Sequence, residues 1–294
     1  MQQRKLKIYF TSDVHGYFYP TTYGDMTEKN VGLFGCAGNF KKDEDTLILD
    51  GGDILQGSAF AYYCRQVADS PEVIADIMND CGYDYYTLGN HDFNYGLEYQ
   101  AAYRSRNNGV CVCQNITDEA GNTLFPWKLH TMKNGLRVGI VGIVTDYVNI
   151  WEKEENLKGI HITDPFEAAK NALAQMKEQT DLTICIYHGG FECDLESGET
   201  LSQTTENVGY RICKELDFDI LLTGHQHMSV PGRDIFGTYT VQPCDNAKEY
   251  QYLEVTMTDH EKSIRSELRQ SDAAKGTVLA DKYRSTENAV QTWL

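Results

Sequence analysis

Short apolar runs alternate with longer amphipathic stretches along most of the chain. The runs are rich in β-branched and aromatic residues, which favour strands, and they cover residues 6–11, 46–49, 85–88, 136–144, 182–187, 220–223, 238–241 and 250–257. Helical stretches separate some of the runs, and this interleaving predicts an α/β domain. Where two runs are close together, as the last two are, we expect antiparallel additions to the sheet.

Two helices have clear start signals. The first begins at Ser70-Pro71-Glu72, where a capping residue precedes a proline, and is expected to end at Gly82. The second begins at Asp164, and Glu167 completes the spacing of a capping box. Their apolar stripes consist of Ile74, Ile77, Met78 and Cys81 in the first helix and of Phe166, Ala169, Leu173 and Met176 in the second. Both helices are expected to cover sheet faces.

The pattern predicts one domain over residues 1–265, because no repeat, low-complexity segment or proline-rich linker interrupts it. After Ser266 the sequence becomes polar, and the stretch from Thr277 is typical of a helix. That helix ends on the apolar pair Trp293-Leu294, which has no evident packing partner. We therefore interpret residues 266–294 as a C-terminal tail in which a linker helix toward a further domain begins.

The composition indicates a globular protein with a strongly acidic surface. The 294 residues are 41% hydrophobic, enough to bury a sizeable core, and the formal net charge is −17. Because the acidic residues are spread along the chain, a nucleic-acid polymer or an anionic membrane is not expected as a partner. A small anionic substrate would need local positive charge, which bound metal ions can supply.

The cysteines and the N-terminus favour a cytoplasmic location. Nine cysteines form no CxxC pair, and their odd number fits no closed disulfide framework. The basic start of the chain passes directly into a predicted strand without the apolar stretch of a signal peptide, and no segment reaches membrane-spanning length. A leader removed earlier would leave the same N-terminus, so a periplasmic or cell-surface location stays open.

Five segments place metal-ligating residue types at or just after the ends of predicted strands, where α/β proteins place their sites. They are Ser12-Asp13-Val14-His15-Gly16, Gly51-Gly52-Asp53, Gly89-Asn90-His91-Asp92, Tyr187-His188-Gly189-Gly190 and Gly224-His225-Gln226-His227. Each contains a glycine near the polar residues, which allows a sharp turn. A single histidine near a strand end is usually structural, but five of the eight histidines lie in this set. This concentration favours a ligand role.

The segments supply seven candidate ligands: Asp13, His15, Asp53, Asn90, His188, His225 and His227. Carboxylate, imidazole and amide groups without a thiolate suit divalent Mn, Fe, Zn, Co or Ni. Seven ligands are enough for two ions if one carboxylate bridges them, and Asp53 is the natural bridge. Two ions roughly 3.5–4 Å apart can hold a bridging hydroxide and clamp a phosphate ester. His91 remains beside Asn90, and we expect it to protonate the leaving oxygen or to stabilise charge there.

In their order and spacing, these motifs resemble those of the calcineurin-like metallophosphoesterases. The resemblance extends over residues 6–258 and implies a four-layer α/β/β/α sandwich of two mixed sheets flanked by helices. It also implies a ligand set for each metal: Asp13, His15, Asp53 and His227 for one, and Asp53, Asn90, His188 and His225 for the other. His91 would be the catalytic histidine, next to Asn90.

Within that family, the insert 17–38 and the run 89–97 are similar to the bacterial 5′-nucleotidase and 2′,3′-cyclic-nucleotide phosphodiesterase/3′-nucleotidase group. The 5′-nucleotidase branch usually carries an acid where this chain has Asn94, and Asn94-Tyr95-Gly96 is more similar to the cyclic-phosphodiesterase branch. This departure leaves open whether a carboxylate orients His91. The resemblance further implies a C-terminal substrate-binding domain that holds the nucleoside by aromatic stacking and is expected to follow this chain.

The leading functional hypothesis is hydrolysis of nucleotide phosphate esters, as cyclic diesters or as monoesters, by a hydroxide that bridges two metal ions. The alternatives are a 5′-nucleotidase/UDP-sugar hydrolase, a nucleotide-sugar pyrophosphatase and a phosphoprotein phosphatase, which use the same centre. A metal-binding interaction module without activity would be expected to lack ligands that are present here. The aromatic cluster at residues 17–19 and the pair Cys111 and Cys113 are interpreted as packing residues, and His130, His161 and His260 as structural histidines.

Overall fold

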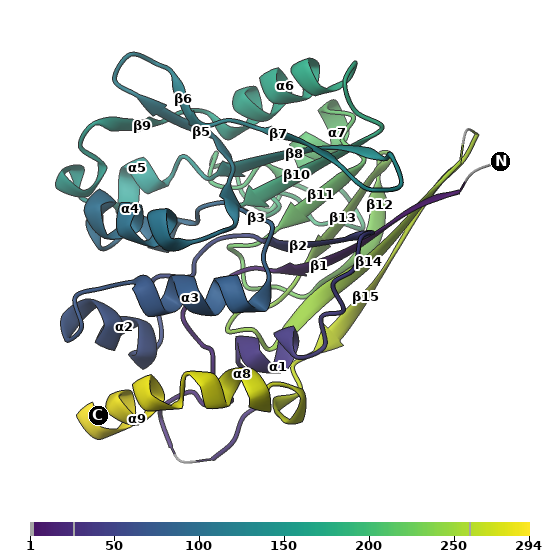
Figure 1. The fold of residues 1–294 in the computed structure, drawn as a ribbon. Helices are drawn as coiled ribbons and strands as arrows, with labels where there is room; N and C mark the ends of the chain where they lie inside the picture. The colour runs from purple at the N-terminus through teal and green to yellow at the C-terminus, as the bar shows by residue number, and fades with distance from the viewer. Residues whose placement is uncertain (1–2, 26, 259) are drawn as a thin grey trace.

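Two six-stranded mixed sheets pack face to face in the computed structural model, which describes residues 3–25, 27–258 and 260–294. The strand order is β15-β14-β1-β2-β3-β4 in the first sheet and β12-β13-β11-β10-β8-β7 in the second. Helices cover the outer face of each sheet (Figure 1). The predicted four-layer α/β/β/α architecture is confirmed.

The strands are β1 (Arg4–Thr11), β2 (Thr46–Asp50), β3 (Tyr85–Tyr86), β4 (Val110–Cys111), β5 (Cys113–Asp118), β6 (Thr123–Phe125), β7 (Lys128–Thr131), β8 (Arg137–Val144), β9 (Ile160–Ile162), β10 (Leu182–His188), β11 (Ile220–Thr223), β12 (Val230–Ile235), β13 (Thr238–Gln242), β14 (Glu249–Met257) and β15 (Lys262–Gln270). The α-helices are α1 (Leu33–Ala37), α2 (Ala59–Gln66), α3 (Glu72–Cys81), α4 (Gly96–Arg106), α5 (Val148–Trp151), α6 (Pro165–Met176), α7 (Gly209–Glu215), α8 (Thr277–Lys282) and α9 (Arg284–Trp293). Short 3₁₀ helices are η1 (Asn90–Phe93), η2 (Glu154–Leu157) and η3 (Ala273–Lys275).

Alternation along the central strands separates the core into layers. In β1, Ile8 packs between the two sheets, whereas the next residue, Tyr9, packs on the opposite side among the helices of the first sheet. In β10, Ile184 faces the first sheet and Cys185 faces α6 and α7. Successive side chains of a strand point to opposite faces, so a strand covered on both faces is apolar throughout. This explains why the predicted strands are continuous apolar runs.

All eight predicted strands are present, both predicted helices begin within a residue of their start signals, and the first ends at Cys81, just before the predicted stop. Helix α6 has its predicted cap, because the Asp164 side chain accepts a hydrogen bond from the Glu167 N–H at 3.0 Å. Helix α3 stops at Gly82, whose φ of 82° lies in the left-handed region. The prediction missed β4, β5, β6, β7, β9, β12 and β15. These strands lie at sheet edges or in the small sheet β6-β5-β9, where burial is incomplete and apolar runs are short.

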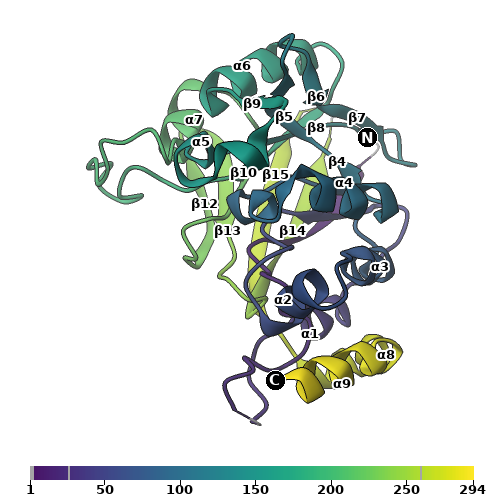
Figure 2. The same ribbon diagram turned by 90° about the vertical axis from the view of Figure 1, so that its left-hand side faces the viewer.

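The C-terminal segment packs on the helices of the first sheet. Strand β15 continues across residues 265 and 266, and α8 and α9 lie against α1 and α2 (Figure 2). The Tyr19 hydroxyl donates to the Ala280 carbonyl at 2.7 Å. The expectation that Trp293 lacks a packing partner is wrong, because the centroid of its ring lies 5.9 Å from the ring centroid of Tyr62. The interpretation of this segment as the start of a linker to a further domain stays a prediction.

The aromatic cluster, the cysteines and the helices bear on three further expectations. Phe18 and Tyr19 are buried in the core at 0% and 4% exposure, so they pack as expected. All nine cysteines are free thiols. Among the described helices, none has the length and apolar character needed to cross a membrane.

Candidate metal centre

All of the predicted site residues lie where the carboxyl ends of β1, β2, β3, β10 and β11 meet. Asp13 and His15 follow β1, Asp53 follows β2, Asn90 and His91 follow β3, His188 ends β10, and His225 and His227 follow β11. Strands β1, β2 and β3 are parallel, as are β10 and β11. Their carboxyl ends therefore point to the same edge of the sandwich, and segments up to 212 residues apart in sequence meet there.

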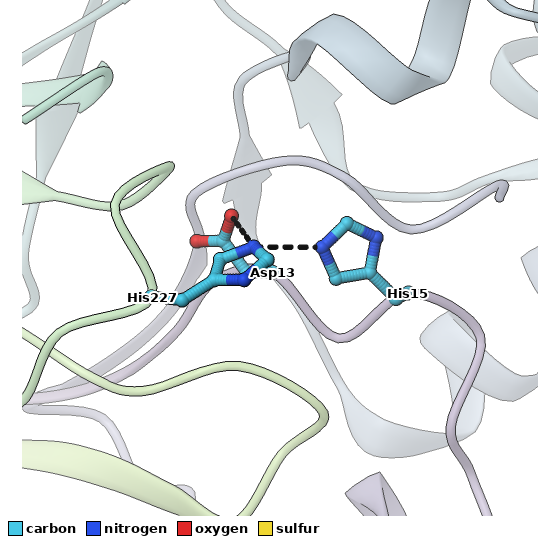
Figure 3. A group of neighbouring side chains, drawn as sticks. All are labelled: Asp13, His15 and His227. Atoms are coloured by element: carbon cyan, nitrogen blue, oxygen red, sulfur yellow. Dashed lines mark hydrogen bonds and ion pairs between the residues drawn. The ribbon is translucent and has the colours of Figure 1, made fainter. Parts of the chain in front are cut away.

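Two groups of side chains could each hold a metal ion. The buried group consists of Asp13, Asp53 and His188, and the exposed group consists of Asp13, His15 and His227 (Figure 3). Within each group the ligand atoms lie within 4.8 Å of one another. In the exposed group, Nε2 of His227 lies 3.4 Å from Oδ1 of Asp13 and 3.0 Å from Nε2 of His15. Asp13 belongs to both groups.

Two further residues extend these groups. The amide oxygen of Asn90 lies 3.1 Å from Nε2 of His188 and 2.9 Å from Nδ1 of His225. One oxygen of Asp53 also faces both groups, since Oδ2 is 3.2 Å from Nε2 of His188 and 3.9 Å from Nε2 of His15. An oxygen with a histidine of each group beside it has the placement that a bridging ligand requires.

Backbone carbonyls determine which ring nitrogen faces the site. Nδ1 of His188 lies 2.6 Å from the Gly51 carbonyl oxygen, and Nδ1 of His15 lies 2.9 Å from that of Gln56. A carbonyl only accepts, so Nδ1 carries the hydrogen in both rings and the neutral ring presents a lone pair at Nε2. Nε2 of His188 then faces two other acceptors, the oxygens of Asp53 and Asn90. Such a cluster of lone pairs needs a cation, so the donor set fits a divalent metal ion.

In the absence of metal, a proton on His188 takes the place of the cation. Burial lowers the pKa of His188, but the charges of Asp53 and Asp13 outweigh burial and raise it to about 10. Burial conversely raises the pKa of Asp53, yet the charge of His188 outweighs this and holds it well below its usual value. A metal ion must therefore displace a proton on binding.

Left-handed backbone conformations are concentrated at this site. They include Asp13, His15, Asp53, His225 and His227, with φ between 52° and 72°. For a residue with a side chain this conformation costs roughly 1–2 kcal/mol, so it persists only where the surroundings enforce it. Position 89 has no room for a side chain, because a Cβ on Gly89 would lie 2.1 Å from Oδ1 of Asp53. These turns direct the ligands toward a common point.

Asp92 joins two of the loops, a role that was not assigned from the sequence although the residue lies in a recognised motif. Its carboxylate accepts hydrogen bonds from the backbone N–H groups of Asp53, Ile54, Leu55 and Gly89, at 2.8–3.0 Å. The loop after β2 is thereby tied to the loop after β3. This connection fixes Asp53 relative to the segment that carries Asn90 and His91.

A carboxylate also reaches His91, but through an intermediate residue. Nδ1 of His91 lies 2.8 Å from Oδ1 of Asn94, and Nδ2 of Asn94 donates to Oε2 of Glu152 at 2.7 Å. Because a carboxylate only accepts, Glu152 orients the amide so that its oxygen faces His91. A carboxylate therefore does orient His91 through Asn94, and it belongs to Glu152, 58 positions from Asn94 in the chain. The sequence contained no signal for Glu152.

A cavity of about 500 Å³ opens beside the ligands. Its lining residues are Asn90, His91, Asn94, Val148, Trp151, Glu152, Glu206, His225 and Gln226. Glu206 lies on the far side of His225, with Oε1 2.9 Å from Nε2 of that ring. Neither Trp151 nor Glu206 belongs to a motif, so sequence reasoning missed both.

The chain is similar to a number of known proteins, and three of them illustrate the likeness. The trifunctional nucleotide phosphoesterase protein YfkN of Bacillus subtilis is 29% identical over 262 residues, and the match covers 80% of this chain and 17% of that protein. A 2′,3′-cyclic-nucleotide 2′-phosphodiesterase/3′-nucleotidase of Yersinia enterocolitica is 27% identical over 248 residues, which cover 78% of this chain and 37% of that protein. A solved structure from Staphylococcus aureus, provisionally named a 5′-nucleotidase, has a TM-score of 0.85 and 30% identity.

The solved structure covers 94% of this chain, whereas the chain covers 58% of it. This chain therefore spans less than two thirds of each of the three proteins. The family profile described as calcineurin-like phosphoesterase matches residues 6–229. That range contains every ligand of both groups and His91. The chain therefore belongs to the calcineurin-like phosphoesterases, a family of metal-dependent phosphoric ester hydrolases, as its motifs predicted.

Proposed function

We propose that this chain is the catalytic domain of a nucleotide phosphoesterase that hydrolyses 2′,3′-cyclic nucleotides and nucleoside monophosphates. The observation that carries the proposal is the pair of carboxylate and histidine groups that share Asp13 at the strand ends. The names of the relatives, which include a cyclic-nucleotide phosphodiesterase/3′-nucleotidase, support nucleotides as the substrate class. The acidic chain, with its net charge of −17, suits a small substrate rather than a nucleic-acid polymer or an anionic membrane.

We infer that two divalent ions are held here, chosen among Mn, Fe, Zn, Co and Ni. One would be held by Asp13, His15, Asp53 and His227, and the other by Asp53, Asn90, His188 and His225. Such ions would lower the pKa of a water molecule and neutralise charge on the phosphate oxygens. The position of Asp53 Oδ2 between His15 and His188 supports a bridging role for this residue.

His91 would hold the proton for the leaving oxygen. Its ring centroid lies 5.3 Å from that of His15, and the ring lines the cavity beside the ligands. Since Asn94 accepts from Nδ1, the free nitrogen is Nε2, which can donate to the leaving oxygen when the ring is protonated. Glu152 orients the Asn94 amide that accepts from this ring. His91 is thus the catalytic histidine in this proposal, and Asn90 lies beside it as a ligand.

Two proposals concern the surroundings of the domain. A C-terminal substrate-binding domain would add contacts to the nucleoside, since the relatives are longer than this chain. A cytoplasmic location is proposed on the nine free thiols, which suit a reducing compartment.

A substrate panel tests the proposed function. The purified chain, loaded with Mn²⁺, is assayed with 2′,3′-cyclic AMP, 3′-AMP, 5′-AMP, UDP-glucose and a phosphoserine peptide. We expect turnover of the cyclic nucleotide and the monophosphates. Cleavage of the peptide alone would favour a phosphoprotein phosphatase, and no turnover of any substrate would favour an interaction module.

His91→Asn serves as the matched variant for this panel. We expect it to retain the metal content of the unchanged chain and to slow turnover by roughly 10²–10⁴-fold, because it removes the proton donor but no ligand. Elemental analysis and steady-state kinetics measure the two quantities. Unchanged turnover would refute the role of His91.

A further inference from the structure

One wall of the cavity beside the ligands is aromatic, and no step proposed above uses it. Trp151 is the last residue of α5, which follows the carboxyl end of β8. Its indole stacks on the ring of His225, with centroids 5.4 Å apart and ring planes inclined by 29°. The ring of Tyr147 contacts the indole edge-on, at a centroid distance of 5.5 Å. These two contacts hold the indole in a defined orientation.

The indole nevertheless remains open to solvent. Trp151 is 48% exposed, although its neighbour Val148 in the same cavity wall is only 1% exposed. A tryptophan that served packing alone would gain from deeper burial, since it carries one of the largest apolar surfaces of any side chain. An oriented aromatic surface that remains accessible inside a cavity is a typical feature of sites for planar ligands.

The charges of the cavity restrict what this ligand can be. The nine described lining residues include two carboxylates, Glu152 and Glu206, and neither lysine nor arginine. Glu206 faces His225, and the amide oxygen of Gln226 accepts from the Phe191 N–H at 2.8 Å. A second phosphate group would meet negative charge here, whereas an uncharged ring would meet the indole. The cavity therefore suits a planar ring without a further phosphate.

His91, the proposed proton donor to the leaving oxygen, lines the same cavity, so in the proposed reaction the group that occupies the cavity is attached to that oxygen. We propose that Trp151 is a stacking platform for the base of the nucleoside leaving group, built into the catalytic domain itself. This inference rests on the proposed function. It adds a specificity: nucleoside monophosphates and cyclic nucleotides bind, whereas substrates whose leaving group carries a phosphate, such as nucleotide sugars, are disfavoured.

Comparing a nucleotide with an ester that lacks a ring tests the platform. In Trp151→Leu, we expect the KM for 5′-AMP or 2′,3′-cyclic AMP to rise by about 5- to 150-fold, the range expected for loss of one base stack. The KM for glycerol 2-phosphate should change by less than about twofold, because no ring is bound. Trp151→Phe should restore most of the nucleotide affinity. Ile150→Ala is the matched control, since Ile150 is 67% exposed on the same helix.

Two outcomes would overturn the platform. The first is an unchanged nucleotide KM in Trp151→Leu. The second is an equal rise in KM for the nucleotide and for glycerol 2-phosphate, because Trp151 would then only support the His225 ring. The proposed function fails in a different way, visible in the unchanged chain: glycerol 2-phosphate is cleaved and no nucleotide is.

A binding measurement without turnover completes the test. The chain has three tryptophans, and replacing Trp127 and Trp293 by phenylalanine leaves Trp151 as the single tryptophan fluorophore. We expect adenosine to quench its fluorescence and ribose to leave it unchanged. If neither compound changes the emission, the platform is refuted whatever the kinetics show.

Discussion

The two ligand groups share Asp13 but differ in their surroundings. The side chains of the buried group, Asp13, Asp53 and His188, are at most 1% exposed. In the exposed group, His15 is 8% and His227 41% exposed. The buried group is held by the end of a central strand and by loops between the two sheets, whereas His227 lies on a loop at the surface.

This difference indicates that carboxylates and histidines contribute differently to stability and to metal binding according to how deeply they are buried. In the buried group each charge depends on the others, because low solvent screening strengthens their coupling and no water replaces a lost partner. In the exposed group, water reaches the His227 side chain itself, which weakens its coupling to Asp13 and His15. We therefore expect the buried group to govern the stability of the metal-free fold as well as metal binding, and the exposed group to govern metal binding alone.

The largest effect is expected where the two groups meet. Asp53→Asn should remove a charge that faces both His188 and His15 and should lower turnover by about 10³-fold or more, since both of the proposed ions would lose a ligand. The metal content should fall in parallel. Elemental analysis and nucleotide turnover measure these changes. If Asp53→Asn retained both ions and its rate, the groups would not be joined through this residue.

The next largest effect separates the groups by stability. In the metal-free protein, His188→Ala should lower the free energy of unfolding by about 3–5 kcal/mol, because it leaves two buried carboxylates without a cation. His227→Ala should change it by less than about 1 kcal/mol, because the His227 side chain is 41% exposed and His188 still faces Asp13. Urea unfolding in the presence of a chelator measures both. Equal losses would contradict the difference between the groups.

A third carboxylate, Asp50, tests whether burial alone or the charges that face a carboxylate decide its pKa. Asp50 is as buried as Asp53, at 1% exposure. Burial raises its pKa to about 7, and the nearby charges of Asp92 and Asp13 add to the increase. In the unfolded chain the pKa is near 3.8. The folded protein therefore binds the extra proton between these values, so its stability falls as the pH rises from about 4 through 7.

Asp50→Asn should remove this dependence. The variant should be more stable than the unchanged chain by about 1–4 kcal/mol at pH 8 and about equal to it at pH 4, where Asp50 is neutral. An asparagine oxygen can still accept the Gly52 N–H, which lies 3.0 Å from Oδ1. Urea unfolding at both pH values, with a chelator present, measures the difference. A stability gap that does not grow with pH would show that Asp50 is already ionised at low pH.

The smallest effect is expected beside the exposed group, at the residue that acts on His91 from a distance. Glu152→Ala should lower kcat by about 10-fold with little change in KM, since the Asn94 amide loses the partner that orients it. Glu152→Gln should restore most of kcat, because its amide oxygen can accept the same hydrogen bond. Steady-state kinetics at saturating Mn²⁺ separates kcat from KM. A loss of metal content in Glu152→Ala would instead indicate a structural role.

The sequence by itself determined the α/β class, the central strands, the family and the residue types of the site. These properties are local: a buried strand is a continuous apolar run, and the residues at its carboxyl end are adjacent to it in the chain. Edge strands such as β15, with few buried positions, carry no such pattern and were missed. The same holds for the pairing of Trp293 with Tyr62, which joins α9 to α2.

Only the tertiary structure decided how deep each ligand lies, which histidine nitrogen faces the site, and which residues assist from outside the motifs. His15 and His227 are 212 residues apart, and Asn94 and Glu152 are 58 apart, so their contacts depend on the packing of the two sheets. Burial and hydrogen-bond partners are set by what the rest of the chain brings near. For that reason Glu152, Glu206 and Trp151 have no sequence signal, although all three line the cavity beside the ligands.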